Sequence, residues 1–229
     1  MSHRSGPLPS SATLTTTLSA RLRGAILRGE FEPGSKLVLD RVREAYQVSL
    51  SPLREALCRL ESEGLVVAED QRGYRVTPVS ADNLTEVIRL RCDLEAMAAK
   101  EAMIHGDAAW EGRILAALHQ LNRVKRIEGG DSAREEWERC HRAFHAELIA
   151  PCRMPILQSF CETLHDQSDR YRRIFLKNHT PDRDVPAEHA AIAEAMIERR
   201  ADQAVQMLRD HIERTGRNIQ LALGGKYAR

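Results

Sequence analysis

The sequence has few aromatic residues and no long apolar run. Phe, Trp and Tyr make up 4% of its 229 residues, so any hydrophobic core must consist mainly of Leu, Ile, Ala and Met. No apolar segment approaches the roughly 18 residues that a membrane-spanning helix needs, and no basic segment followed by an apolar one opens the chain. These absences predict a soluble, cytoplasmic protein with no membrane partner.

The chain also has few cysteines and a small net charge. The five cysteines form an odd set without a C-x-x-C pair, which argues against a disulfide framework or a thiolate zinc finger. Residues 1–80 hold 11 basic and 9 acidic residues (net +2), and the remainder holds 23 and 24 (net −1). This asymmetry is only weak support for a nucleic-acid partner, so any contact with phosphates must depend on local arrangement. The length suits two domains.

The segment 48–73, VSLSPLREALCRLESEGLVVAEDQRG, is the most informative part of the chain. Ser51 suits a helix N-cap and Pro52 the first helical position, so a helix is expected to begin there. Leu53, Leu57 and Leu60 recur at helical spacing and predict a buried stripe. After Gly64, which should end the helix, two short strands are expected at 65–68 and 74–76 around a polar turn.

Two further helices are expected upstream, at 14–28 and 38–46, which completes a winged helix-turn-helix. In this motif the N-terminal residues of the second helix meet DNA, so Arg54 is the principal candidate for base contact. Ser49 and Ser51 are candidates for phosphate contact, and Arg72 or Gly73 for contact through the wing. The alternative for Arg54 is that it merely solvates an exposed helix face.

Three pieces of this region, PG-x-x-L, S-x-S-P-L-REAL-x-x-L-x-x-EGLV and G-Y-x-V, resemble the DNA-binding domain of the GntR family of bacterial transcription regulators. The resemblance covers about residues 14–78. Many relatives carry arginines where this chain has Leu50 and Asp40, the latter next to Arg41, so the operator contacts at those two positions are not carried over.

From Ser80 onward the pattern is helical throughout, with caps expected at Ser80, Asp107 and Asp131. We therefore expect a mainly α protein, with a disordered tail (1–12), a winged helix-turn-helix (13–78) and an antiparallel all-helical bundle (79–229). The six helices expected in the bundle are 81–105, 108–127, 132–149, 154–178, 185–199 and 201–223.

Four histidines in the bundle suggest a metal site. His141 and His145 are four residues apart on one helix and therefore share a face. His189 and His211 are 22 residues apart (211 − 189), on consecutive antiparallel helices that can bring both rings to one level. The alternative is that such a pair arises by chance among nine histidines on solvated helices.

The segments R-x-x-LEA (91–96), H-x-x-FH, EH-x-x-I-x-x-A and R-x-H resemble the helical effector domain (FCD domain) of the FadR subfamily of GntR regulators. The resemblance implies a metal site in which His141 stands where most members have Asp. Four nitrogen ligands favour Zn²⁺, with Ni²⁺ or Co²⁺ as alternatives. The resemblance also implies a small carboxylate effector, and the sequence is closest to a branch that includes glutarate-responsive repressors.

Arg91 is the expected carboxylate partner because it matches the family pattern, with Arg172, Arg173 and Asn218 as weaker candidates from placement. The alternative for Arg91 is an ion pair with Glu95 on its own helix. The function that follows is a homodimeric repressor that binds a double-stranded DNA operator under the control of a metal-anchored acid. A metal sensor is the second possibility. A metal-dependent enzyme with Glu188 or Glu147 as base is disfavoured, because the chain lacks the H-E-x-x-H motif, a carboxylate-rich di-iron pattern and a phosphate-binding glycine loop.

Overall fold

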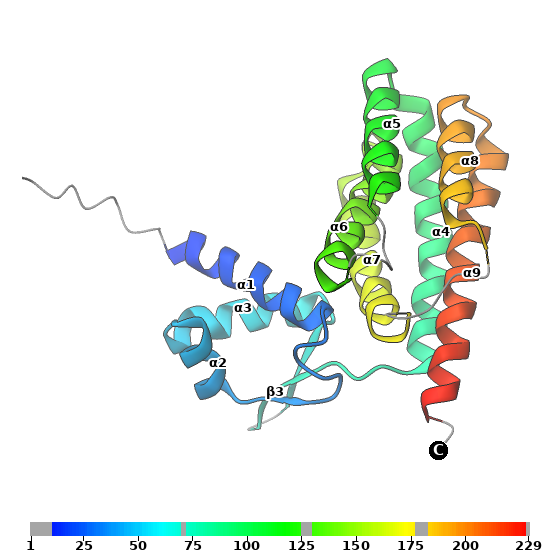
Figure 1. The fold of residues 1–229 in the computed structure, drawn as a ribbon. Coiled ribbons are helices and arrows are strands. Elements are labelled where there is room, and N and C mark those ends of the chain that lie inside the picture. The colour runs from blue at the N-terminus through cyan, green and yellow to red at the C-terminus, as the bar shows by residue number, and fades with distance from the viewer. Residues whose placement is uncertain (1–10, 70–71, 125–129, 177–182, 228–229) are drawn as a thin grey trace, which may run out of the picture. The chain divides into compact units, whose positions relative to one another are not determined.

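The chain forms two compact units, residues 1–79 and 80–229, in a computed structural model that describes residues 11–69, 72–124, 130–176 and 183–227 (Figure 1). The first unit contains three helices and a small sheet, and the second is entirely helical in its described part. Most of the predicted N-terminal tail, residues 1–10, lies outside the described residues. The expected fold, a winged helix-turn-helix followed by a helical bundle, is confirmed.

The N-terminal unit has the three expected helices, α1 (Ser11–Leu27), α2 (Leu39–Tyr46) and α3 (Leu50–Ser62). Leu53, Leu57 and Leu60 are all buried in its core, as their spacing predicts. The predicted start of α3 is wrong. Ser49, in extended conformation, is the N-cap, and Ser51 lies inside the first turn, where its hydroxyl lies 3.4 Å from a Glu55 oxygen.

A three-stranded antiparallel sheet closes this unit in the order β1-β3-β2, with β2 (Val66–Glu69) and β3 (Gly73–Val76) forming the expected wing. The third strand, β1 (Lys36–Leu37), was not predicted, because two residues carry no alternating pattern. It pairs with β3 and places Leu37 in the core opposite Tyr74. The wing is therefore tied to the segment that leads into α2.

The helical unit contains the six expected helices; the first has the predicted bounds, 81–105, and each of the others differs from the prediction at one end or both. The expectations for residues 125–127 and 177–178 fall outside the described residues. Ser80 and Asp107 cap their helices through side-chain oxygens, as expected. Asp131 lies within the first turn of its helix, which begins at Gly130, so its predicted capping role is wrong. The bounds are α4 (Ala81–His105), α5 (Ala108–Arg123), α6 (Gly130–Ile149), α7 (Pro155–Phe175), α8 (Val185–Ile197) and α9 (Ala201–Tyr227).

Helix α4 is central to this unit and packs against α6, α7 and α9 (Figure 1). The core is mainly aliphatic, as the composition requires, and it includes the aromatic side chains of Trp110 and Phe144. Trp110 is anchored by a hydrogen bond from Nε1 to the carbonyl of Glu147 on α6. Within the described residues, no helix is long and apolar enough to cross a membrane.

Candidate functional site

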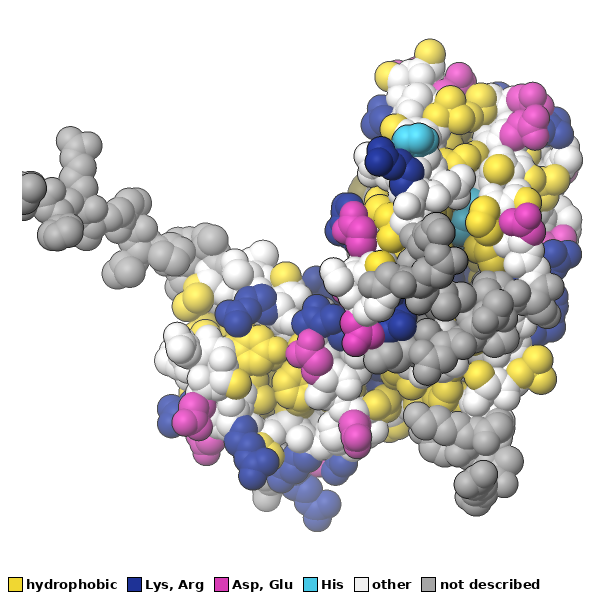
Figure 2. Space-filling model, in the orientation of Figure 1, with side chains coloured by type: hydrophobic (Ala, Val, Ile, Leu, Met, Phe, Trp, Pro, Cys, Tyr) yellow, Lys and Arg dark blue, Asp and Glu magenta, His cyan; other side chains and the backbone are white. Residues whose placement is uncertain are grey.

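The candidate DNA-binding residues of α3 lie on the surface of the N-terminal unit. Ser49, Ser51 and Arg54 are exposed at the start of α3, on the side opposite the buried leucines. Arg54 makes no ion pair or hydrogen bond with any other residue that the structure describes. Its guanidinium is therefore available to a ligand, and the space-filling view shows Lys and Arg side chains gathered on one edge of this unit (Figure 2).

The wing residues lie at the turn between β2 and β3. Arg72 is exposed, and its backbone N–H donates to the carbonyl of Glu69 at 2.9 Å. Gly73 has φ +88°, a left-handed conformation that glycine adopts without strain. On the following strand Arg75 pairs with Glu69 at 2.7 Å, which braces the wing.

Four histidines converge from three helices of the second unit. His141 and His145 project from α6, His189 from α8 and His211 from α9. One ring nitrogen from each lies within 4.8 Å of those of the other three, and all four side chains are buried. The sequence prediction that these residues come together is therefore confirmed. We call this set the histidine cluster.

Packing and hydrogen bonding fix the rings of the cluster. Trp137 stacks on His141 with ring centroids 4.7 Å apart, and Phe144 lies 5.1 Å from His189. His211 Nδ1 lies 2.9 Å from Glu188 Oε2, which leaves Nε2 as the ring atom of His211 that is not engaged by this carboxylate. Such a carboxylate partner fixes the orientation of a metal-binding imidazole and raises its basicity.

The cluster carries buried nitrogens without partners. His141 Nδ1, His189 Nε2 and both ring nitrogens of His145 make no hydrogen bond in the described part of the chain. Burial lowers the pKa of His141, His145 and His189 well below the usual value, and neighbouring cationic groups lower it further. Burial also lowers the pKa of His211, against the opposing effect of Glu188. The rings are therefore neutral at pH 7.

These features fit a divalent transition metal. A metal ion binds neutral imidazole nitrogens at about 2.1 Å, so two ligands on opposite sides lie about 4.2 Å apart. Separations of at most 4.8 Å need only a small contraction to reach that spacing. Buried polar atoms without partners are costly, and coordination would satisfy them. The four histidines would hold the ion, which would supply a Lewis-acidic charge for an anion.

The candidate effector-binding arginines are already engaged by acidic residues. Arg91 donates to Glu95 at 2.7 Å and to Ser168 at 2.9 Å, and both Arg91 and Glu95 are buried. The ion pair that the sequence offered as an alternative is thus present. Asn218 is half-buried on α9, further along the helix than His211.

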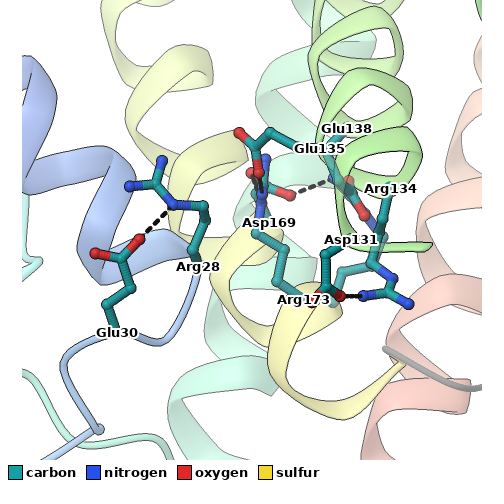
Figure 3. A network of polar contacts seen from close by, with 9 residues as sticks. Arg28, Glu30, Asp131, Arg134, Glu135, Glu138, Asp169 and Arg173 are labelled. Atoms are coloured by element: carbon teal, nitrogen blue, oxygen red, sulfur yellow. Dashed lines mark hydrogen bonds and ion pairs between the residues drawn. The ribbon is translucent and has the colours of Figure 1, made fainter.

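Arg173 belongs to a network of ion pairs between α6 and α7 that includes Glu135 and Asp169 (Figure 3), and Arg172 is paired within the same network. Arg172 pairs with Glu138 at 2.6 Å and with Asp169 at 2.5 Å. Arg173 pairs with Asp169 at 2.9 Å and with Glu135 at 2.5 Å. Glu138 lies one turn before His141, so this network adjoins the histidine cluster and ties α7 to the helix that carries two of its members.

The sequence prediction missed a fifth buried histidine. His165 on α7 has ring centroids 5.7 Å from His145 and 5.9 Å from His141, and it is 6% exposed. Both of its ring nitrogens are buried and without a partner among the described residues. Its segment, LHDQSD, contains no second histidine at helical spacing, so the sequence offered no local signal.

Comparison with protein families identifies both units. A model described as "Bacterial regulatory proteins, gntR family" matches residues 14–76, and an "FCD domain" model matches residues 86–214, more than half of the chain. The chain belongs to the gntR family of bacterial regulatory proteins. Its second unit is the FCD domain of this gntR regulator, so the resemblance seen in the sequence is confirmed.

Curated relatives agree with this assignment. The regulator is 34% identical to "Uncharacterized HTH-type transcriptional regulator BphR" of Paraburkholderia xenovorans (strain LB400), over 90% of this chain and 85% of the relative. It is 32% identical to "HTH-type transcriptional repressor GlaR" of Escherichia coli (strain K12), over 89% and 94%. The protein is therefore a DNA-binding transcription regulator and not an enzyme.

Solved structures share the fold. E. coli McbR/YncC superposes with a TM-score of 0.77 at 22% identity, covering 93% of this chain and 98% of that one. A gntR regulator from Rhodococcus sp. RHA1 superposes with a TM-score of 0.72 at 23% identity, covering 90% and 96%. At these identities the likeness shows the fold alone.

Proposed function

We propose that this gntR regulator is an operator-binding repressor whose FCD domain binds a small organic acid through a divalent metal held by the histidine cluster. The observation that carries the proposal is the convergence of four buried, neutral imidazoles whose ligand atoms lie within 4.8 Å of one another. Four nitrogen donors favour Zn²⁺, with Ni²⁺ or Co²⁺ as alternatives. An operator partner puts its site of action in the cytoplasm.

The charges around the cluster support a role for metal in acid binding. Arg91 is neutralised by Glu95, and Arg172 and Arg173 share Asp169, Glu138 and Glu135. These groups provide three positive and four negative charges. An acid entering without metal would meet no excess of positive charge in this set. Neutral imidazoles leave a bound ion with its full 2+ charge, which is strong enough to attract a carboxylate.

In this arrangement the metal binds the carboxylate of the acid first, and the arginines then contact it. An Arg91 guanidinium held beside the cluster by Glu95 and Ser168 has donors in fixed orientation for the second oxygen of a metal-bound carboxylate. Binding would also compete with Glu95 or Glu138 for these arginines and so shift α4 or α7 slightly. Such a shift would be transmitted through residues 77–80, which join β3 to α4, and would alter operator affinity. The change in operator affinity can be no larger than the difference in the acid's affinity for the two arrangements of the FCD domain.

The operator-binding form is proposed to be a homodimer. Two winged helices related by a two-fold axis would bind a pseudo-palindromic operator, with Arg54, Ser49 and Ser51 at the major groove and Arg72 and Gly73 at the wing. Leu90, Met97 and Ile104 support self-association, since they recur every seventh residue on α4 and are 40%, 48% and 70% exposed. This exposed apolar stripe suits a helix-to-helix interface.

Metal analysis combined with calorimetry tests the proposal. The wild-type regulator is expected to hold one zinc per chain and to bind short mono- and dicarboxylates, including glutarate, only when metal is present. The variant His145→Ala, His189→Ala should lose both properties. A control variant, His105→Ala, His119→Ala, removes two histidines outside the cluster and should lose neither. Acid binding that survives metal removal, or a cluster variant that keeps its zinc, would overturn the proposal.

A metal sensor is the second candidate function. It is favoured by the composition of the cluster, because four imidazoles complete a tetrahedral zinc site without any ligand from outside. In that case operator affinity would respond to buffered zinc alone. Gel-shift titrations at fixed free zinc, with and without the acid, separate the two functions.

A further inference from the structure

A small cavity lies beside the histidine cluster, between α4, α6 and α7. Its volume is about 30 Å³, and its wall includes Glu95, His145, Ala146, Ile149, Cys161 and His165. His145 belongs to both the cluster and this wall, so the cavity adjoins the proposed metal site. Ala146 and Glu162, which also lines the cavity, are exposed, so the wall extends to the protein surface.

The wall of the cavity is apolar except at a few points. Ala146 and Ile149 are hydrocarbon, and Cys161 is a neutral thiol, because burial raises its pKa to about 12. The buried polar groups are Glu95, His145 and His165. His165 stands out because neither of its ring nitrogens has a hydrogen-bond partner among the described residues. Burying imidazole nitrogens that lack hydrogen-bond partners costs free energy, so we expect a bound group to form hydrogen bonds with them.

We propose that His165 is a specificity residue for the effector, and that it and Glu95 bind an uncharged hydroxyl on a short hydroxy acid whose carboxylate is held at the metal. This inference rests on the proposed function. A hydroxyl donates one hydrogen bond and accepts others. The carboxylate of Glu95 can only accept hydrogen bonds, whereas a neutral imidazole donates one through one of its nitrogens. Together the two groups can accept from a hydroxyl and donate to it.

Charge and size exclude other groups from this cavity. A second carboxylate would lie beside Glu95 and Glu162, while Arg142, the cation in the wall, is paired with Asp166. An apolar group would leave the His165 nitrogens without partners. A volume of about 30 Å³ accommodates about two water-sized groups, so the substituent must be small. A hydroxyl on a short chain meets all three requirements.

The test compares acids that differ by one hydroxyl. Zinc-loaded full-length protein is titrated calorimetrically with propionate against lactate, and with glutarate against 2-hydroxyglutarate. The hydroxy acid of at least one pair should bind about tenfold more tightly than its parent, the effect expected of two net hydrogen bonds. His165→Leu should abolish this preference while retaining one zinc per chain and the affinity for the parent acid. His165→Gln, which keeps a donor, should retain part of it.

A matched control removes a histidine elsewhere. His119 is exposed on α5, outside the cluster and the cavity wall, and His119→Leu should keep the full preference. If parent acids bind in a metal-dependent way but neither pair shows a preference, or if His165→Leu keeps it, the role of His165 is overturned and the proposed function stands. Loss of zinc in His165→Leu would also overturn it, by making His165 part of the metal site. If no acid binds, or binding needs no metal, the proposed function itself fails.

Discussion

Glu188 Oε2 lies 2.9 Å from His211 Nδ1 and thereby joins α8 to α9 at the histidine cluster. The same carboxylate accepts from Arg183 at 2.7 Å and from Arg214 at 3.0 Å. Because Glu188 immediately precedes His189, one carboxylate on α8 orients an imidazole on the neighbouring helix beside a cluster member of its own. The position of His211 therefore depends on a residue that is itself no ligand.

Removal of this carboxylate should weaken metal binding. Glu188→Ala leaves His211 Nδ1 without its acceptor, and we expect zinc affinity to fall about 10- to 100-fold, as for other partners of metal-binding imidazoles. Competition with a chromophoric chelator measures the change. Glu194→Ala, an exposed position on the same helix, is the control. Unchanged zinc affinity in Glu188→Ala would show that packing alone orients His211.

Loss of Arg54 should weaken operator binding. Its side chain is exposed at the start of α3 and has no partner in the described part of the chain, so truncation should leave the fold intact. We expect Arg54→Ala to cost about 1 to 3 kcal/mol of binding free energy in a gel-shift titration. Arg139→Ala removes one exposed charge from the FCD domain and is the control. Equal affinities for wild type and Arg54→Ala would exclude base or phosphate contact at this position.

The metal-free protein should lose stability as the pH falls from about 7 to 5. The folded-state pKa values of His141, His145 and His189 are lowered by burial, whereas the unfolded chain protonates these residues near pH 6.5. The unfolded state therefore binds more protons over this range, and each histidine contributes a loss of up to about 1.4 kcal/mol per pH unit.

Urea denaturation of chelator-treated protein at pH 7.5, 6.5 and 5.5 measures this loss. The His145→Ala, His189→Ala variant lacks two of the groups and should show a shallower dependence on pH. A wild-type stability that is flat across the series would mean that the histidines have the same pKa in the folded state as in the unfolded chain.

A charge on the apolar stripe of α4 should weaken the proposed dimer. Met97→Glu places a carboxylate in the middle of Leu90, Met97 and Ile104, where burial against a second copy would be costly. Sedimentation equilibrium should show a lower average mass for this variant than for wild type. Leu115→Glu introduces the same charge at an exposed position on α5 and should keep the wild-type mass. A dimer that tolerates Met97→Glu would place the interface on another face.

The helices and the wing could be predicted from the sequence, because local patterns of residues decide them. The leucines of α3 repeat at helical spacing and are all buried, and Ser80 and Asp107 cap the helices that follow them. The start of α3 was misplaced because Ser49 and Ser51, three residues and one residue before Pro52, offer similar capping chemistry. Only the backbone conformation of Ser49 distinguished them.

The sequence also indicated the histidine cluster, through one pair at helical spacing and a second pair 22 residues apart on consecutive helices. Tertiary structure alone decided what surrounds it. The partners of Arg91 on α7 and of Arg172 on α6, and the approach of His165 to His145, join residues on different helices. Such approaches depend on how helices cross and pack, and no spacing along the chain encodes them. Local sequence patterns therefore predicted the helices, the wing and four of the buried histidines. The position of the fifth histidine and the charge balance around the cluster depend on helix packing.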